Sequence, residues 1–454
     1  MKKFLRMGKG VRSDKKSDIF SSIIPIYYLS KLMGLAPLSL AYTHDKQGRH
    51  AVTLKTSVPA VLYTVLLITG IAASECFVLM FFKYDTFFSG VEGTKQVLVA
   101  EFVISGITCV TSLAIGLRRI RKEMNSLLYK VSVIDTLLGT KTDILRSNEI
   151  YMWMQVTSLA FLLFLVHSND FFFMYSGFII GLWVIAMYVC NFIRFVTIMQ
   201  FVNLICLLKQ KFKILNNYLA SDENPSKYRT NNNLWEILLQ TPRFRNEDNW
   251  KDDALQIEAF YDAFNRRHYS NIIMQVSTNV CIQNSWLEKE KLRCRSLRII
   301  WDVLCDISSS VNSMYGLQIL FCIVSAFFEI TTNLSYAIMA LKLKKLKNLI
   351  LVHKLMSAAI WALTQFLQLF WIVASCSAAS GEANRSFILL QKLLLLAELH
   401  PATAAEIQLF LQQVRDRKPN FTAWEFFTIN YSLLGSTVGA IITLLVIMVQ
   451  MQGN

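Results

Sequence analysis

Small and polar side chains recur along one face of the last hydrophobic segment, residues 432–451. They stand three or four residues apart, and this spacing places side chains on a single face of an α-helix. The stripe consists of Ser432, Ser436, Gly439, Thr443, Ile447 and Gln450. A helix that touched only lipid would not need such a face. The face therefore either lines a water-filled path or packs closely on another helix, for which Gly435 and Gly439 form a motif.

A second polar face lies in the hydrophobic segment 349–376 and consists of Ser357, Trp361, Thr364, Gln365 and Gln368. Neighbouring segments bring further candidates to the predicted outer half of the membrane: Glu101, His167, Trp183, Ser325, Phe328 and Glu329. Polar side chains at that depth usually face a cavity or a partner helix. Aromatic surface beside amides, hydroxyls and carboxylates suits a small polyol, which stacks and hydrogen-bonds. These residues form the predicted ligand site, and hydrogen bonding between helices is the alternative.

The sequence contains no motif for enzyme chemistry. The patterns GxxxxGK[ST], HExxH and GxSxG are missing, and so is a pair of CxxC motifs. The nine cysteines are mostly single, and several lie in apolar runs, where a thiol behaves as a small hydrophobic group. We therefore predict no catalytic residue, no cofactor and no metal site.

The elements that position these residues are predicted to be membrane helices. Hydrophobic residues make up 54% of the 454-residue chain and charged residues 17%, which is low for a soluble domain. Seven segments approach the roughly 20 apolar residues that cross a bilayer. They are residues 57–82, 97–117, 153–173, 177–208, 316–334, 349–376 and 432–451. The fourth and sixth are longer, and we expect them to continue as soluble helix.

The distribution of lysine and arginine predicts the orientation of the chain. These residues gather in the N-terminal tail and after the second and fourth segments, whereas the loop at 167–170 has none. Positive flanks stay in the cytosol, so the N-terminus lies inside and the C-terminus outside. The lysines at 342–347 disagree, and the side of that loop stays open. The net charge of +15 then lies mainly in the cytosolic flanks of the spans, near anionic lipid. We therefore predict no nucleic-acid partner.

The seventh segment resembles the signature of insect gustatory receptors, a Thr-Tyr pair followed by five hydrophobic residues and Gln-Phe. Thr443 and Gln450 keep this spacing, whereas Leu444 replaces the tyrosine and Met451 the phenylalanine. Residues 426–443 also resemble that family, and Cys376 with Glu382 and Ala383 is similar to its C…EA pattern. Residues 23–40 resemble the fructose-receptor branch.

This resemblance implies an all-α membrane protein with seven transmembrane helices that acts as a ligand-gated cation channel in the plasma membrane of sensory neurons. It implies a homotetramer, or a tetramer with related subunits, around a central pore. The seventh helix would line the pore, with Thr443, Ile447, Gln450 and Met451 at the pore or gate. The ligand is expected in the outer half, among the second to sixth spans. It would be a small tastant such as fructose, with a bitter compound as the alternative.

The resemblance also implies a cytosolic anchor that holds the tetramer, built from the ends of spans four to six and a short helix at 404–415 that continues through 424–429. The chain then divides into six regions. They are a cytosolic N-terminal region (1–56), transmembrane helices one to four (57–208), a cytosolic loop with helices (209–296), transmembrane helices five and six with cytosolic extensions (297–376), anchor helices (377–431) and the pore-lining helix (432–454). The cytosolic loop contains a flexible insert (216–253).

Two other classes of membrane protein remain as alternatives. A G-protein-coupled receptor would place its N-terminus outside, but the charges place it inside, and no DRY-like triplet or NPxxY motif appears. A secondary transporter would show inverted repeats, and we find none in the sequence.

Overall fold

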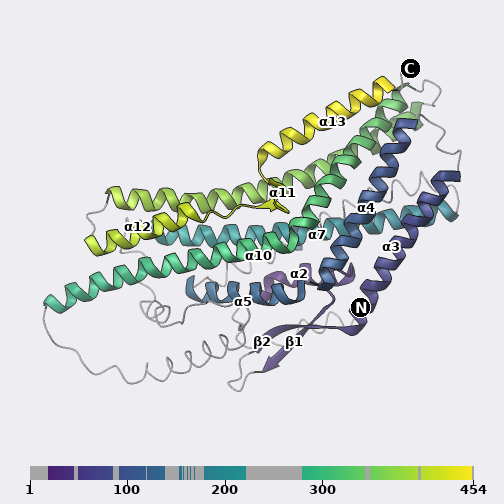
Figure 1. Ribbon diagram of the computed structural model, residues 1–454. Coiled ribbons are helices and arrows are strands. Elements are labelled where there is room, and N and C mark those ends of the chain that lie inside the picture. Colours follow the sequence, from purple (N-terminus) through teal and green to yellow (C-terminus); the bar gives the residue numbers. More distant parts are fainter. Residues whose placement is uncertain are drawn as a thin grey trace.

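The computed structural model describes residues 19–44, 50–84, 92–118, 120–138, 153–155, 157, 161, 164, 168, 178–220, 279–342, 348–396 and 400–451. Most of these residues are helical. The helices are α2 (Ile19–Leu32), α3 (Val58–Tyr84), α4 (Glu92–Arg118), α5 (Ile120–Leu138), α7 (Phe178–Ala220), α10 (Asn279–Lys342), α11 (Asn348–Leu396), α12 (Pro401–Asp416) and α13 (Tyr431–Met451). Helices α7, α10 and α11 run alongside one another, and α13 leaves them toward the C-terminus (Figure 1).

Six of the described helices are long and apolar enough to cross a membrane, namely α3, α4, α7, α10, α11 and α13. They contain six of the seven predicted spans. The third, residues 153–173, lies outside the described residues except for a few positions. Three helices greatly exceed the roughly 20 residues that a bilayer needs. Their lengths are 43 residues for α7, 64 for α10 and 49 for α11, so each continues well beyond an apolar membrane core.

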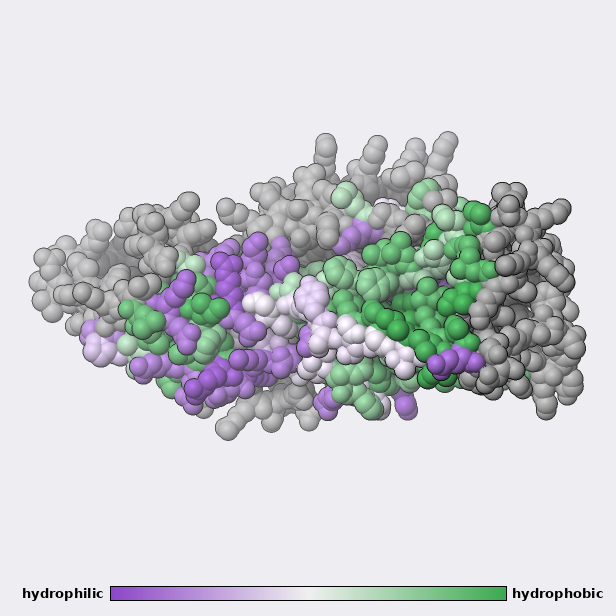
Figure 2. All heavy atoms as spheres, turned by 90° about the horizontal axis from the view of Figure 1, so that it is seen from above, coloured by the Kyte–Doolittle hydropathy of each residue, from purple (hydrophilic) through white to green (hydrophobic). Residues whose placement is uncertain are grey.

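The surplus lengths of α7, α10 and α11 pack with α12 into a second region. At its centre the ring of Trp301 lies edge-on to Phe212 of α7 and Phe410 of α12, with centroids 5.2 and 6.4 Å away. All three side chains are fully buried. Hydrophilic residues gather toward one end of the visible face and hydrophobic ones toward the other (Figure 2). This division agrees with an anchor outside the membrane, and its cytosolic location stays a prediction.

The predicted flexible insert begins too early. Residues 216–220 belong to α7, and Asn216 is 1% exposed. Its amide donates a hydrogen bond of 2.7 Å to the carbonyl oxygen of Glu382 and accepts one from Ser386. The apolar stripe continues through Leu215 and Leu219, which are buried, so the helix continues with it. Residues 221–253 lie outside the described residues.

The predicted continuation of the anchor helix through 424–429 is wrong. Helix α12 ends at Asp416, and strands β3 (Thr422–Ala423) and β4 (Phe427–Thr428) form an antiparallel hairpin instead. Asn312 of α10 holds the first strand of this hairpin through two hydrogen bonds. Its side-chain amide donates to the Thr422 hydroxyl at 2.8 Å, and its side-chain oxygen accepts from the Thr422 N–H at 2.9 Å. A Cβ on Gly316 would lie 3.0 Å from the Trp424 nitrogen, so the hairpin approaches α10 closely because this residue is glycine.

A second hairpin, which the sequence analysis did not predict, precedes the first span. Strands β1 (Leu38–His44) and β2 (His50–Thr56) are antiparallel, with Leu38 opposite Thr56. The signal was present, because Val52 and Leu54 alternate with polar residues, as in a strand with one covered face.

The predicted orientation can be tested with the glycosylation sequons at Asn333, Asn384, Asn420 and Asn430, of which Asn430 would lie on the cytosolic side. Only Asn333 would face outward, and its amide already donates to the Glu329 carbonyl oxygen at 2.7 Å. Asn384 and Asn420 are exposed but would be cytosolic. We expect no mass shift on enzymatic deglycosylation. The control is Phe87→Asn, which completes a sequon with Ser89 in a loop predicted to lie outside and should add a glycan. A glycan on Asn384 or Asn420 would reverse the topology.

Candidate functional site

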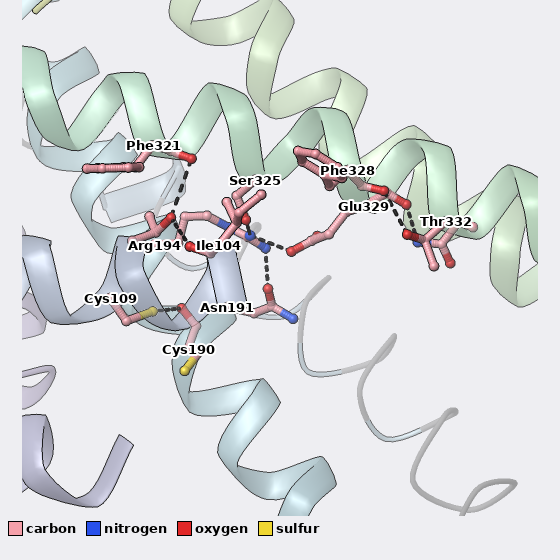
Figure 3. Close-up of polar contacts among 12 residues, drawn as sticks. Ile104, Cys109, Cys190, Asn191, Arg194, Phe321, Ser325, Phe328, Glu329 and Thr332 are labelled. Atoms are coloured by element: carbon pink, nitrogen blue, oxygen red, sulfur yellow. Dashed lines mark hydrogen bonds and ion pairs between the residues drawn. The ribbon is translucent and has the colours of Figure 1, made fainter. Parts of the chain in front are cut away.

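A buried ion pair lies where α7 meets α10. The guanidinium of Arg194 forms a salt bridge with Glu329 and donates to the Ser325 hydroxyl and the Asn191 side-chain oxygen (Figure 3). Arg194 is 1% exposed and Glu329 4%. Charges in a membrane interior are costly unless paired, and they mark functional or tightly specified sites. The contacts therefore hold the guanidinium in one position between the two helices.

Glu329 and Ser325 are among the predicted ligand-site residues, whereas Arg194 is not. The available signal was a cation within an otherwise apolar segment, residues 177–208. A lone basic residue at that depth requires an acidic partner. The acidic residues within the predicted spans, and therefore the candidates for that partner, are Glu75, Glu101, Asp170 and Glu329.

A small cavity of about 20 Å³, enough for roughly one water molecule and partly open to solvent, lies beside the ion pair. Residues of α3, α4, α7 and α10 line it. They are Ser74, Glu75, Glu101, Phe102, Ser105, Ala186, Met187, Cys190 and Glu329. The cavity thus brings together Glu101 and Glu329, two of the predicted ligand-site residues, and Ser325 joins them through Arg194. Helix α3, which contributes Ser74 and Glu75, was not part of the predicted site.

The predicted polar face of α11 lies apart from this cavity lining. Thr364, Gln365 and Gln368 are buried, and Ser357 and Trp361 are half-buried. The Thr364 hydroxyl donates to the Ile360 carbonyl at 2.8 Å, whereas the side-chain oxygens of Gln365 and Gln368 accept no hydrogen bond from the described residues. This face is therefore buried inside the subunit and retains hydrogen-bonding capacity.

The remaining predicted ligand-site residues are placed as follows. Phe328 of α10 is half-buried and lies edge-on to Phe327, with ring centroids 5.3 Å apart. Trp183 lies in α7, where only its backbone is described, and His167 lies outside the described residues.

No other described part of the chain covers the polar stripe of α13. Ser432, Ser436, Gly439, Thr443, Ile447 and Gln450 are all exposed. On the opposite face Ile441 and Met448 are buried, and the Ser335 hydroxyl donates to the Met448 sulfur at 3.3 Å. A Cβ on Gly435 or Gly439 would meet no atom within 4 Å. The small residues therefore serve no helix packing within the described subunit. Met451 ends the helix, and its side chain is not described.

The comparisons with known proteins agree with this architecture. A family model described as 7tm Chemosensory receptor matches residues 23–452. The solved structure of the insect olfactory receptor OR5 from Machilis hrabei is similar, with a TM-score of 0.56 and 13% identity over 94% of this chain and 97% of that one. Its complex with eugenol gives a TM-score of 0.54 and 12% identity over 95% and 98%. No curated protein matches the chain. Likeness at such low identity shows the fold alone.

Proposed function

Since the chain belongs to the 7tm chemosensory receptor family, we propose that it is a ligand-gated cation channel in the plasma membrane of sensory neurons. The observation that carries this proposal is the exposed polar stripe of α13. A stripe that the described chain leaves uncovered within a hydrophobic helix needs water or another subunit beside it. Four copies of α13 around a central axis provide both.

In this homotetramer, or in a tetramer with related subunits, Ile447 forms an apolar ring and Gln450 a polar ring one turn farther along. An apolar ring closes a pore by dewetting, and a polar ring shapes ion entry. Thr443 lies deeper, and Met451 stands at the outer end. The anchor around Trp301 holds the subunits together outside the membrane.

The ligand of the proposed channel is a small tastant, and the sequence resemblance favours a sugar such as fructose. Carboxylates at the cavity and amides with Trp361 on α11 are groups that bind hydroxyls and sugar rings. The similar receptor from Machilis hrabei is described in complex with eugenol, which supports a small organic ligand. A bitter compound is the second candidate, and the excess of carboxylates around the cavity favours it, because many bitter compounds carry a basic nitrogen.

The direct test records currents from cells that express only this chain. A panel of sugars that includes fructose and a panel of bitter compounds are applied in turn. We expect a cation current with members of one panel. If the protein reaches the surface and neither panel opens a current, the proposal that this chain alone forms a tastant-gated channel fails.

The same recordings test the α11 face. We expect Trp361→Ala to raise the agonist concentration for half-maximal current about tenfold, because a stacking aromatic contributes about 1–3 kcal/mol in a buried site. The matched control is Phe366→Ala, a change at an exposed aromatic side chain of the same helix. An unchanged dose–response curve in Trp361→Ala removes this face from the ligand site.

A further inference from the structure

Acidic side chains outnumber basic ones around the cavity beside Arg194. Three carboxylates line it, those of Glu75, Glu101 and Glu329. Arg194 pairs with Glu329. The guanidinium therefore offsets one carboxylate, and two others, from α3 and α4, face the same space. Burial disfavours the ionised form of an acid and a nearby cation favours it, so a bound cation and these two carboxylates would stabilise each other.

Several polar atoms around the cavity have unused hydrogen-bonding capacity. One side-chain oxygen of Glu101 accepts no hydrogen bond from the described residues, although the residue is only 7% exposed. The same holds for one oxygen of Glu75. A buried polar atom without a partner costs free energy that a bound group would recover. The orphaned oxygens therefore point to an occupant that donates hydrogen bonds.

The position of Glu75 depends on a glycine of the neighbouring helix. A Cβ built on Gly106 of α4 would lie 2.7 Å from the Cγ and Cδ atoms of Glu75. Any larger residue would push this carboxylate away. Because Gly106 follows Glu101 by little more than one helical turn, the close approach of α3 to α4 brings two acidic side chains to one cavity.

We propose that this cavity binds a protonated amine of an organic ligand, held by Glu75 and Glu101 beside the Arg194–Glu329 pair. An ammonium group has three donors and no acceptor, which matches carboxylate oxygens that need donors. A metal ion fits less well, since no group of three or more acidic, histidine or cysteine side chains within the described residues could hold one. The inference rests on the proposed function in one respect, because it takes the second candidate ligand, a bitter compound with a basic nitrogen, as the one that opens the channel.

The test uses the purified full-length chain and a matched pair of probes. Phenethylamine carries the ammonium group, and phenethyl alcohol has the same shape without the charge. Binding is measured by titration calorimetry. We expect the amine to bind at least about tenfold more tightly than the alcohol, as one charge-assisted hydrogen bond implies. Glu101→Gln should remove this preference while leaving the weak binding of the alcohol unchanged.

The control for charge removal is Glu406→Gln in α12, where the carboxylate lies 3.5 Å from Arg298 and lines no part of the cavity. It should preserve the preference for the amine. If Glu101→Gln does not yield folded protein, Glu75→Gln at the half-buried position replaces it, with the same expected loss. Equal binding of the two probes to the wild type, or an intact preference in a folded Glu101 or Glu75 variant, overturns the proposal.

Currents separate this inference from the proposed function. Amine binding that depends on Glu101, without current from any compound, supports the cavity assignment and contradicts the channel. Current evoked by fructose, together with equal binding of amine and alcohol, supports the channel and overturns the assignment of the amine.

Discussion

Replacing Arg194 by methionine alone is expected to destabilise the protein by about 3–5 kcal/mol, because it leaves a carboxylate buried without its counter-charge. Glu329 is 4% exposed and would lose its salt bridge. The hydroxyl of Ser325 and the side-chain oxygen of Asn191 would lose a donor as well. We expect little protein at the cell surface. Thermal unfolding of the detergent-purified chain measures the loss directly.

The double variant Arg194→Met with Glu329→Met should recover most of that stability, since apolar side chains can replace both members of a buried pair at little cost. The comparison pair is Arg298 and Glu406, whose side chains are 23% and 14% exposed. There Arg298→Met should cost only about 1 kcal/mol, as for a pair near solvent. An Arg194→Met protein as stable as the wild type would show that Glu329 does not require this partner.

Replacing Ile447 by serine is expected to produce current without any ligand. The side chain is 46% exposed in the subunit, and in the proposed tetramer it forms the apolar constriction. Four hydroxyls would hydrate that constriction, and a closed pore that relies on dewetting would then conduct. Whole-cell recording before any agonist is applied measures the effect, with the surface level of the protein determined in parallel.

Ile442→Ser is the matched control for the pore prediction. Ile442 is 56% exposed and belongs to the same helix, but it does not lie on the polar stripe. It should leave the unliganded current near zero. If Ile447→Ser behaves in the same way while reaching the surface, α13 does not provide the gate, and its stripe is a contact surface between subunits.

The helical framework was predictable because the length of an apolar segment alone decides whether it can span a bilayer. The two hairpins were harder to predict. The second depends on Asn312 and Gly316, which lie more than a hundred residues before the strands that they contact. Such a contact leaves no local pattern in residues 422–428. The helical interpretation of 424–429 followed from family resemblance, and the backbone of Trp424 and Glu425, with φ of 48° and 64°, excludes it.

The candidate site was predictable by residue type and only in part by arrangement. Glu101, Ser325 and Glu329 stood out as polar residues in apolar segments, and the structure brings them to one place. Glu75 joins them because Gly106 lets α3 approach α4. Packing between distant segments decides which helix faces meet. The periodicity within a single segment does not show which face of another helix it will contact. The polar face of α11 contributes no residue to the lining of this cavity, and its part in the ligand site stays a prediction.

The 64-residue helix α10 is attached to α13 near both of its ends. Near Asn312 and Gly316 it holds the hairpin from which α13 begins, and at Ser335 it touches Met448 near the other end of α13. These attachment points lie about 29 Å apart along α10, nearly the whole length of α13. Glu329 lies between them. A displacement of α10 at the cavity would therefore reach both ends of α13 at once, and in the proposed channel this continuous backbone would couple the ligand to the gate.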